Sequence, residues 1–218
     1  VNSGTIDRYG ILWGQKTTRY LGQVYAHPII RAVDQQQLPL RRQVQAKQPK
    51  IIVSGMSRRL KCTLDVEGNL LAGKSTCIVL STIDSKLDLD RHYLLGLLNS
   101  KLLSFYFCHR FAGNRLQGGY FRIGTEQLRQ LPIVIPDLTS LEERKSYEKV
   151  IDLVKARMTI MEKEDVSSKI EKTEKLDEDR DKDKLDQKID HLVFELYCLT
   201  DKERAAIEQI QFEKIRER

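Results

Sequence analysis

The sequence predicts an α+β protein in which a small mixed-sheet domain is followed by an antiparallel helical hairpin. Three observations lead to this prediction. A β-branched run at residues 50–53, followed by turn-forming residues, is typical of a small sheet. Residues 91–107 are apolar on nearly every side of a helix, as in a central helix. Two amphipathic segments that flank a charged stretch indicate the helical hairpin.

We place the first domain at residues 1–138 and expect an irregular chain up to about residue 48, with residues 35–48 forming a Gln-rich loop or a partly helical segment. Residues 50–53 predict a strand that ends in a turn. Residues 62–66 and 75–80 predict a β-hairpin whose turn lies at residues 67–69. Asp90 is expected to cap one continuous helix over residues 91–107.

A glycine-rich segment at residues 108–124 follows that helix. Gly113, Gly118 and Gly119 predict a loop, and the glycine pair permits positive φ angles and a close backbone approach. This suits a loop that contacts a ligand and equally a plain tight turn. Residues 120–123 predict a returning strand. A short helical turn from residue 125 and an extended segment at 131–136 complete the domain.

The second domain, residues 139–218, is expected to be a helical hairpin or spacer. Ser140 and Glu143 form a capping box, which predicts a helix start. Apolar residues then recur at helical spacing between Tyr147 and Met161, and again between Leu185 and Leu196. Residues 162–184 hold 17 charged side chains among 23, so this tip is predicted to be solvated helix or disordered. A last helix is expected from Thr200 to about Ile210.

The net charge of +6 is divided unequally along the chain. Residues 1–140 carry 19 Lys and Arg against 9 Asp and Glu, a net +10, whereas residues 141–218 carry −4. Within the first part, residues 35–64 and 91–125 contain no acidic residue at all. Such stretches leave a positive potential without local neutralisation, which favours a polyanion partner such as nucleic acid. A solvated basic surface is the alternative.

The sequence lacks the signals that indicate a membrane protein, a disulfide-linked protein, a metal site or a nucleotide-binding site. No apolar run approaches 18 residues, so we expect no membrane partner. The four cysteines are far apart and without CxxC spacing, which indicates reduced thiols in the cytoplasm. The four histidines have no metal-ligand spacing, and no phosphate-binding glycine motif occurs. We therefore predict a binding module with no catalytic residue, cofactor or metal site in this chain.

Five segments together resemble one known family. They are PKIIVS, YLLGLLNSKLLSFYF, QGGYFRIG, LRQLPIVIP and KIDHLVFELYCLTD, at residues 49–54, 93–107, 117–124, 128–136 and 188–201. In this order they are similar to the TaqI-like C-terminal specificity domain. This domain is the target-recognition part of type II and IIG restriction-modification enzymes and adenine-specific DNA methyltransferases. Asp7-Arg8-Tyr9 also resembles the opening segment of the family.

The resemblance implies a module that reads a short double-stranded DNA sequence in the major groove. It would present the target adenine to an upstream methyltransferase domain in cis, which would bind S-adenosylmethionine. The NPPY-type motif of that domain does not occur in these 218 residues, so we expect it to precede Val1. Endonuclease activity accompanies methylation in some enzymes of this kind, and they act in the bacterial cytoplasm.

Basic and amide side chains on loops supply the candidate DNA contacts. Arg and Lys bind phosphates, whereas Arg, Asn and Gln form bidentate pairs with guanine or adenine. We expect the arginines at 58 and 59 to read bases, and the lysine at 61 to bind phosphate. Tyr120 is expected to stack or wedge at the duplex, or else to lie half-buried on a strand. The predicted DNA-binding residues are Arg58, Arg59, Lys61, Lys74, Arg110, Asn114, Arg115, Gln117, Tyr120 and Arg122.

Two alternatives remain open. The apolar stripes of the helical hairpin are also suited to docking a partner subunit or to self-association, which would make the chain a protein-interaction or dimerisation module. A specificity subunit of a type I restriction system is the other alternative. It is disfavoured because only one recognition domain is visible in the sequence, where two tandem copies are expected.

Overall fold

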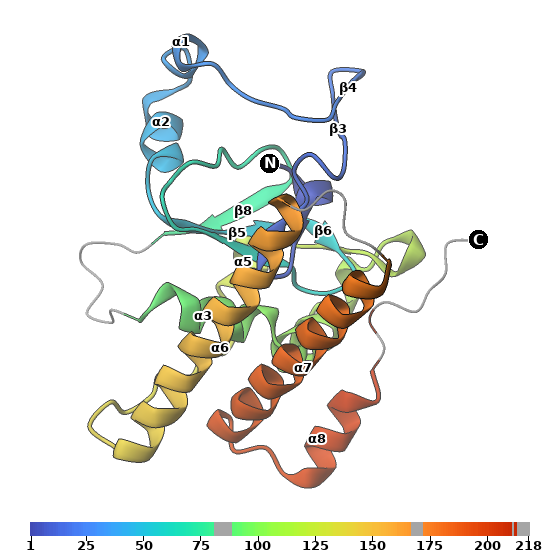
Figure 1. Cartoon of the computed structure of the whole chain (residues 1–218). Coiled ribbons are helices and arrows are strands. Elements are labelled where there is room, and N and C mark those ends of the chain that lie inside the picture. The colour runs from blue at the N-terminus through green and yellow to red at the C-terminus, as the bar shows by residue number, and fades with distance from the viewer. Residues whose placement is uncertain (81–88, 167–171, 211, 213–218) are drawn as a thin grey trace.

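The computed structural model describes residues 1–80, 89–166, 172–210 and 212, and it confirms the α+β class (Figure 1). Short strands and helices fill the first two thirds of the chain. The long helices α6 (Leu141–Val166) and α7 (Lys172–Leu196) then pack against each other and are followed by α8 (Asp201–Glu208). None of the helices within the described residues has the length and apolarity that a membrane span needs.

A three-stranded sheet lies at the centre of the first part. Its middle strand is β5 (Lys50–Ser54), which is buried along its whole length and confirms the predicted strand. The outer strands β7 (Cys62–Asp65) and β8 (Thr76–Val79) both form, but each pairs antiparallel with β5. The predicted hairpin between these two segments is therefore wrong. The most apolar strand gains most from burial on both sides and so occupies the middle.

Three pairs of short strands surround this sheet, and every pairing between named strands is antiparallel. The pairs are β1 (Ile6–Asp7) with β2 (Gly10–Ile11), β3 (Thr18–Tyr20) with β4 (Gln23–Tyr25), and β6 (Met56–Ser57) with β9 (Phe121–Arg122). The Gln-rich segment is partly helical, as one alternative predicted. The short helices in and beside it are α1 (Ala32–Gln35) and α2 (Leu40–Ala46).

A buried ion pair fixes the turn after β7. The Lys50 ammonium lies against the Asp65 carboxylate, with the two side chains only 1% and 4% exposed. The carboxylate also accepts hydrogen bonds from the backbone N–H groups of residues 68, 69 and 70, each at 2.9 Å. Because breaking such a pair would leave an uncompensated buried charge, this network is a structural element.

The predicted continuous helix over residues 91–107 is wrong, because the chain breaks at Ser100. Helix α3 (Arg91–Asn99) ends there and α4 (Lys101–Arg110) begins, with Ser100 extended at φ −65° and ψ 156°. The Ser100 hydroxyl accepts from the Leu103 N–H at 3.2 Å and so caps α4. The cap predicted at Asp90 is confirmed, since its carboxylate accepts from the His92 N–H at 2.6 Å.

The break is stabilised by buried polar contacts from three parts of the molecule. The Asn99 side chain exchanges two hydrogen bonds of 2.9 Å with the backbone of Cys62 in β7. The carbonyl of Asn99 accepts from the Arg59 guanidinium at 3.0 Å. The N–H of Lys101 donates to the Asp190 carboxylate of α7 at 2.7 Å. Sheet, central helices and helical hairpin are thus joined at this point.

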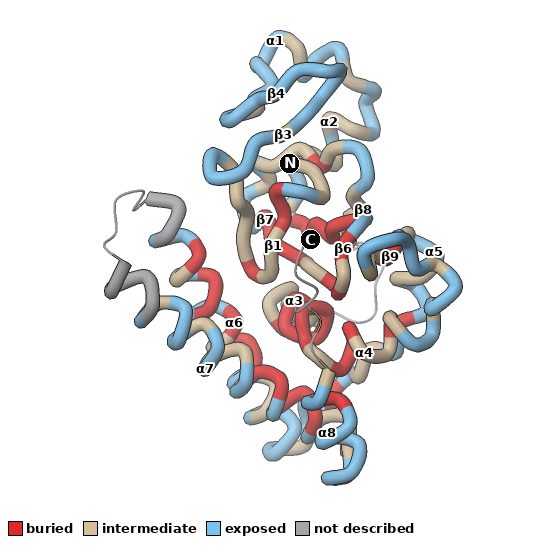
Figure 2. Tube along the Cα trace, turned by 90° about the vertical axis from the view of Figure 1, so that its right-hand side faces the viewer, coloured by how far each residue is buried: buried red, intermediate tan, exposed pale blue. Residues whose placement is uncertain are grey.

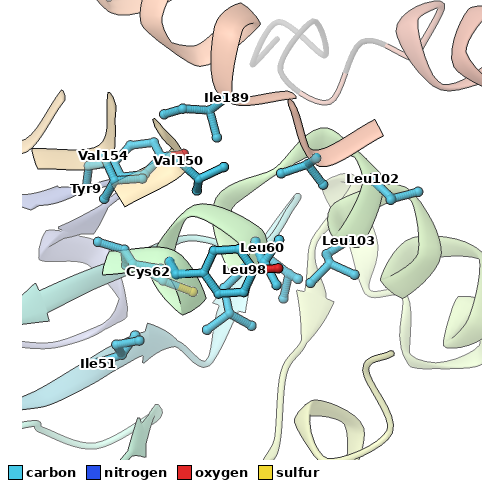
Figure 3. Packing of buried hydrophobic residues seen from close by; sticks show 14 of the residues in the cluster. Tyr9, Ile51, Leu60, Cys62, Leu98, Leu102, Leu103, Val150, Val154 and Ile189 are labelled. Atoms are coloured by element: carbon cyan, nitrogen blue, oxygen red, sulfur yellow. The ribbon is translucent and has the colours of Figure 1, made fainter. Parts of the chain in front are cut away.

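The helical hairpin packs on α3 and α4 through its apolar face. Val150, Val154 and Ile189 are fully buried and belong to the same hydrophobic cluster as the sheet residues Ile51 and Cys62 (Figure 3). Figure 2 shows this shared core between the hairpin and the sheets. The boundary after residue 138 stays a prediction, but the two segments share one core. We therefore do not treat them as independently folding parts.

The helix starts predicted in the second part are present. The Glu143 N–H lies 3.5 Å from the Ser140 hydroxyl, although the Glu143 carboxylate accepts from the Asp137 N–H instead of closing the capping box. The predicted last helix is α8, which starts after Thr200, and Thr200 and Glu203 form its capping box. In the charged tip, residues 162–166 and 172–184 are helical, and residues 167–171 lie outside the described part of the chain.

A second polar cluster joins the start of the chain to the hairpin. The Asp186 carboxylate of α7 accepts from Arg8 at 2.8 Å and from Arg157 at 3.1 Å. The two guanidinium groups lie 5.5 Å and 5.4 Å from the ring centroid of buried Tyr9. The Asp-Arg-Tyr segment singled out in the sequence therefore ties β1 and β2 to α6 and α7.

The substitution Asn99→Ala should destabilise the fold strongly. It removes both side-chain hydrogen bonds to Cys62 in a fully buried position, and it leaves the Cys62 N–H without that acceptor. We expect the free energy of unfolding in urea to fall by about 2–4 kcal/mol. The matched control Asn69→Ala removes an exposed contact with Glu67 and should cost less than about 0.5 kcal/mol. Equal losses for the two variants would contradict this assignment.

Asp190 should make stability fall as pH rises. Burial raises the pKa of this carboxyl above 3.8, although the Lys101 N–H and nearby arginines favour the charged form. Between pH 3.8 and the folded-state pKa, the native protein therefore binds more protons than the unfolded chain, and raising the pH destabilises it. Asp190→Asn keeps an acceptor for the Lys101 N–H, and because the amide does not ionise, its stability does not fall in this way as pH rises. In urea unfolding from pH 4 to 8, the free energy of unfolding of the variant should rise relative to that of the wild type as pH rises. The opposite trend would refute the assignment.

Candidate nucleic-acid interface

The two-stranded ribbon β6–β9 forms the base of the candidate site. Met56 pairs with Arg122 and Ser57 with Phe121. Just before β6, the Gly55 N–H donates to the Ser75 carbonyl and the Gly55 carbonyl accepts from the Ile123 N–H, each at 2.9 Å. A Cβ atom at Gly55 would lie 2.3 Å from the Ser75 oxygen, so glycine is required here. This residue brings the segment before β8 and the segment after β9 together.

The glycine loop connects α4 to β9 through two 3₁₀ turns, η2 (Ala112–Asn114) and η3 (Gln117–Gly119). Gly118 and Gly119 have φ angles of 73° and 78°, a conformation that the sequence of this pair permits. The Leu116 N–H donates to the Tyr120 carbonyl at 2.6 Å and closes the loop above them. An L side chain at either glycine would strain the backbone, and the loop therefore depends on both.

Arg58 lies between the ribbon and the loop. Its Nε donates to the Gly118 carbonyl at 3.0 Å, and its guanidinium lies 4.9 Å from the ring centroid of Tyr120. Tyr120 is half-buried, as one of its two predicted placements has it, but it lies just before β9 and not within that strand. The contact geometry makes Arg58 a residue that positions the loop, because a cation over an aromatic face and a carbonyl bond hold both partners.

Four of the predicted DNA-binding side chains are exposed around this loop. They are Arg110 at the end of α4, Arg115 and Gln117 in the loop, and Arg122 in β9, while Asn114 is half-buried. No carboxylate occurs between residues 91 and 125, and the next one, Glu126, forms an ion pair with Arg129 at 3.0 Å. The loop surface is therefore basic and rich in groups that form bidentate hydrogen bonds.

The three remaining predicted residues lie in different surroundings. Arg59 is buried at 5% exposure, where it donates to Asn99 and lies 5.0 Å from the ring centroid of Phe212. Lys61 is half-buried and forms an ion pair with Asp7 at 2.9 Å. Lys74 is exposed and precedes Ser75, which is hydrogen-bonded to Gly55 at the base of the ribbon. The structure thus brings Lys74 to the ribbon and takes Arg59 into the core.

Met56 is not among the residues predicted from the sequence, but it is 47% exposed and pairs with Arg122 across the ribbon. A strand of two residues has no detectable periodicity, so the sequence contains no pattern that would single this residue out. An exposed methionine beside basic side chains offers an apolar contact, such as the one that a thymine methyl group accepts.

Two thiols and one carboxylate of the chain are relevant to chemistry other than binding. Burial raises the pKa of the Cys108 thiol to about 11 and also raises the pKa of Cys62, so both thiols are protonated at neutral pH. Within the described residues, no group of three or more His, Cys, Asp or Glu side chains could hold a metal ion. Asp65, the last residue of β7, forms an ion pair with Lys50.

Comparison with known protein families identifies one match. The model of the TaqI-like C-terminal specificity domain matches residues 3–133, which include the central sheet, α3, α4, the ribbon and the glycine loop. No curated protein sequence matches the chain. The matched family implies a DNA target-recognition role in restriction-modification enzymes. Since the match covers more than half of its residues, the chain belongs to the TaqI-like C-terminal specificity domain family.

Proposed function

We propose that the chain reads a specific double-stranded DNA sequence through the glycine loop and the β6–β9 ribbon, from the major groove. The observation that carries this proposal is the surface on which Arg115, Gln117 and Arg122 are exposed together, in a stretch of 35 residues without a carboxylate. A two-stranded ribbon fits the major groove, where each base pair presents a distinct pattern of donors and acceptors.

The residues divide into two roles under this proposal. Asn114, Arg115 and Gln117 lie in the loop and read base edges, since their side chains form bidentate pairs with adenine or guanine. Three exposed basic residues outside the loop, Lys74, Arg110 at the end of α4 and Arg122 in β9, bind phosphates. Arg58 and Tyr120 hold the loop in shape. We leave Arg59 out of the interface because of its burial, and Lys61 is held by Asp7.

The chain would act with an upstream methyltransferase domain in cis. That domain would bind S-adenosylmethionine and methylate an adenine that the recognition module presents, with or without an accompanying endonuclease activity. The support for this step is the family, whose members serve restriction-modification enzymes. A protein that acts on DNA in this way would work in the cytoplasm.

The interaction-module alternative has less support. The apolar stripe that it needs is buried by the chain itself, since Val150, Val154 and Ile189 pack on α3 and α4. The type I alternative expects two recognition domains, whereas the family model matches one segment, residues 3–133. Because the hairpin supplies part of the core, the experiments below use the whole chain.

Binding to DNA should depend steeply on salt. We expect the logarithm of the association constant to fall by at least about 2.7 per tenfold rise in salt, that is about 0.9 for each phosphate bound by Lys74, Arg110 and Arg122. Titration of the whole chain against its preferred duplex, selected from a randomised pool, at four salt concentrations measures the slope. An association constant that does not change with salt concentration, or the absence of any preferred sequence in the pool, would contradict the proposal.

The two roles should separate by mutation. Arg115→Ala should change the preferred sequence and cost about 1–3 kcal/mol at one base position. Lys74→Ala should weaken binding equally for all sequences and lower the salt slope by about 0.9. Lys188→Ala is the matched control, because this exposed lysine lies on α7, on the opposite side of the molecule from β9 (Figure 2). An equal loss on every sequence for both Arg115→Ala and Lys74→Ala would refute the division.

A further inference from the structure

The β3–β4 hairpin is the most exposed apolar element near the start of the chain. It projects from the upper right of the body in Figure 1 and is coloured as exposed over most of its length in Figure 2. Tyr20, Leu21 and Val24 are 60%, 84% and 57% exposed. An isolated two-stranded hairpin is only marginally stable in water, so this one presents apolar side chains that a binding partner would cover.

The tip of the hairpin has a narrow and defined shape. A two-residue turn, Leu21-Gly22, joins the strands with φ angles of 48° and 81°, as in the tight turns that match the twist of a hairpin. Leu21 is the only side chain of this turn, because its neighbour is glycine. At the base, the Trp13 indole donates to the Pro28 carbonyl at 3.1 Å and packs against His27. The hairpin is therefore fixed at its base by Trp13 and carries the apolar side chain of Leu21 at its tip.

The charge of this segment indicates the class of partner. From Arg8 to Val33 the sequence contains no carboxylate, and the hairpin and its approach carry Lys16 and Arg19. Arg19 is exposed and lies opposite Val24, one residue from the tip pair. With no carboxylate to repel phosphates, these basic side chains complement the negative charge of a duplex. Apolar side chains that enter the minor groove unstack and kink base steps in this way.

We infer that the β3–β4 hairpin is a second DNA-contacting element, in which Leu21 acts as an apolar wedge at a base step from the minor groove and Arg19 binds the flanking phosphate. This inference rests on the proposed function, since both require that the chain binds duplex DNA. It adds a contact outside the glycine loop, with a role in deforming the DNA as opposed to reading base edges. The wedge makes the bound duplex kinked at the position of the hairpin.

The test uses the whole chain and its selected duplex, with 2-aminopurine placed in turn at each adenine. In the wild type, fluorescence should rise at one step as the base unstacks. Leu21→Asn should abolish this rise and weaken binding about tenfold. Asparagine tolerates positive φ, so the turn is retained. Arg19→Gln should lower the salt slope by about 0.9. The control Leu40→Gln, at a 75% exposed site in α2, should behave as wild type.

Wild-type affinity, salt slope and fluorescence in both hairpin variants would overturn this inference and leave protein docking as the use of the surface. The preferred sequence would still be selected in that case, so the proposed function would stand. If the chain selects no sequence at all, the proposed function fails first. Loss of the fluorescence rise in Leu40→Gln as well would overturn the wedge, because the effect would then not belong to the hairpin.

Discussion

The break between α3 and α4 is the constraint on which the rest of the structure depends. It exposes the Asn99 carbonyl and the Lys101 N–H inside the core, where both must find partners. Arg59 supplies one partner from the loop before β7, and Asp190 supplies the other from α7. The same break sends α4 toward the glycine loop. The position of the candidate interface is therefore set by contacts that span almost the whole chain.

The glycine loop is held on both sides, as the proposed reading of bases would require. Gly55 joins it to the sheet through Ile123, and Arg58 joins the ribbon to Gly118 and Tyr120. Binding groups supported in this way lose little conformational entropy when they bind. The neighbouring arginines 58 and 59 thus have different roles: Arg59 stabilises the break in the core, and Arg58 stabilises the loop. Arg115, in the loop itself, remains exposed.

Long periodic or capped elements could be predicted from the sequence, whereas features that depend on distant partners could not. The strand at residues 50–54, the helices of the hairpin and α8 follow from local pattern alone. Ser100 within an apolar run is compatible with a continuous helix, and the partner Asp190 that favours a break lies 90 residues further on. For Arg58 and Arg59, the strand β6 is too short to show which side chain faces inward.

The distribution of charge has a structural cause as well as a functional one. The acidic hairpin is not only an appendage, because Asp186 neutralises Arg8 and Arg157 where the hairpin meets the first part of the chain. Asp190 likewise lies in the core near Arg59. The two carboxylates thus lie among the arginines at 8, 59 and 157, whereas Arg110, Arg115 and Arg122 are on the surface. No carboxylate occurs within residues 91–125, so the positive potential at the glycine loop is available to a polyanion.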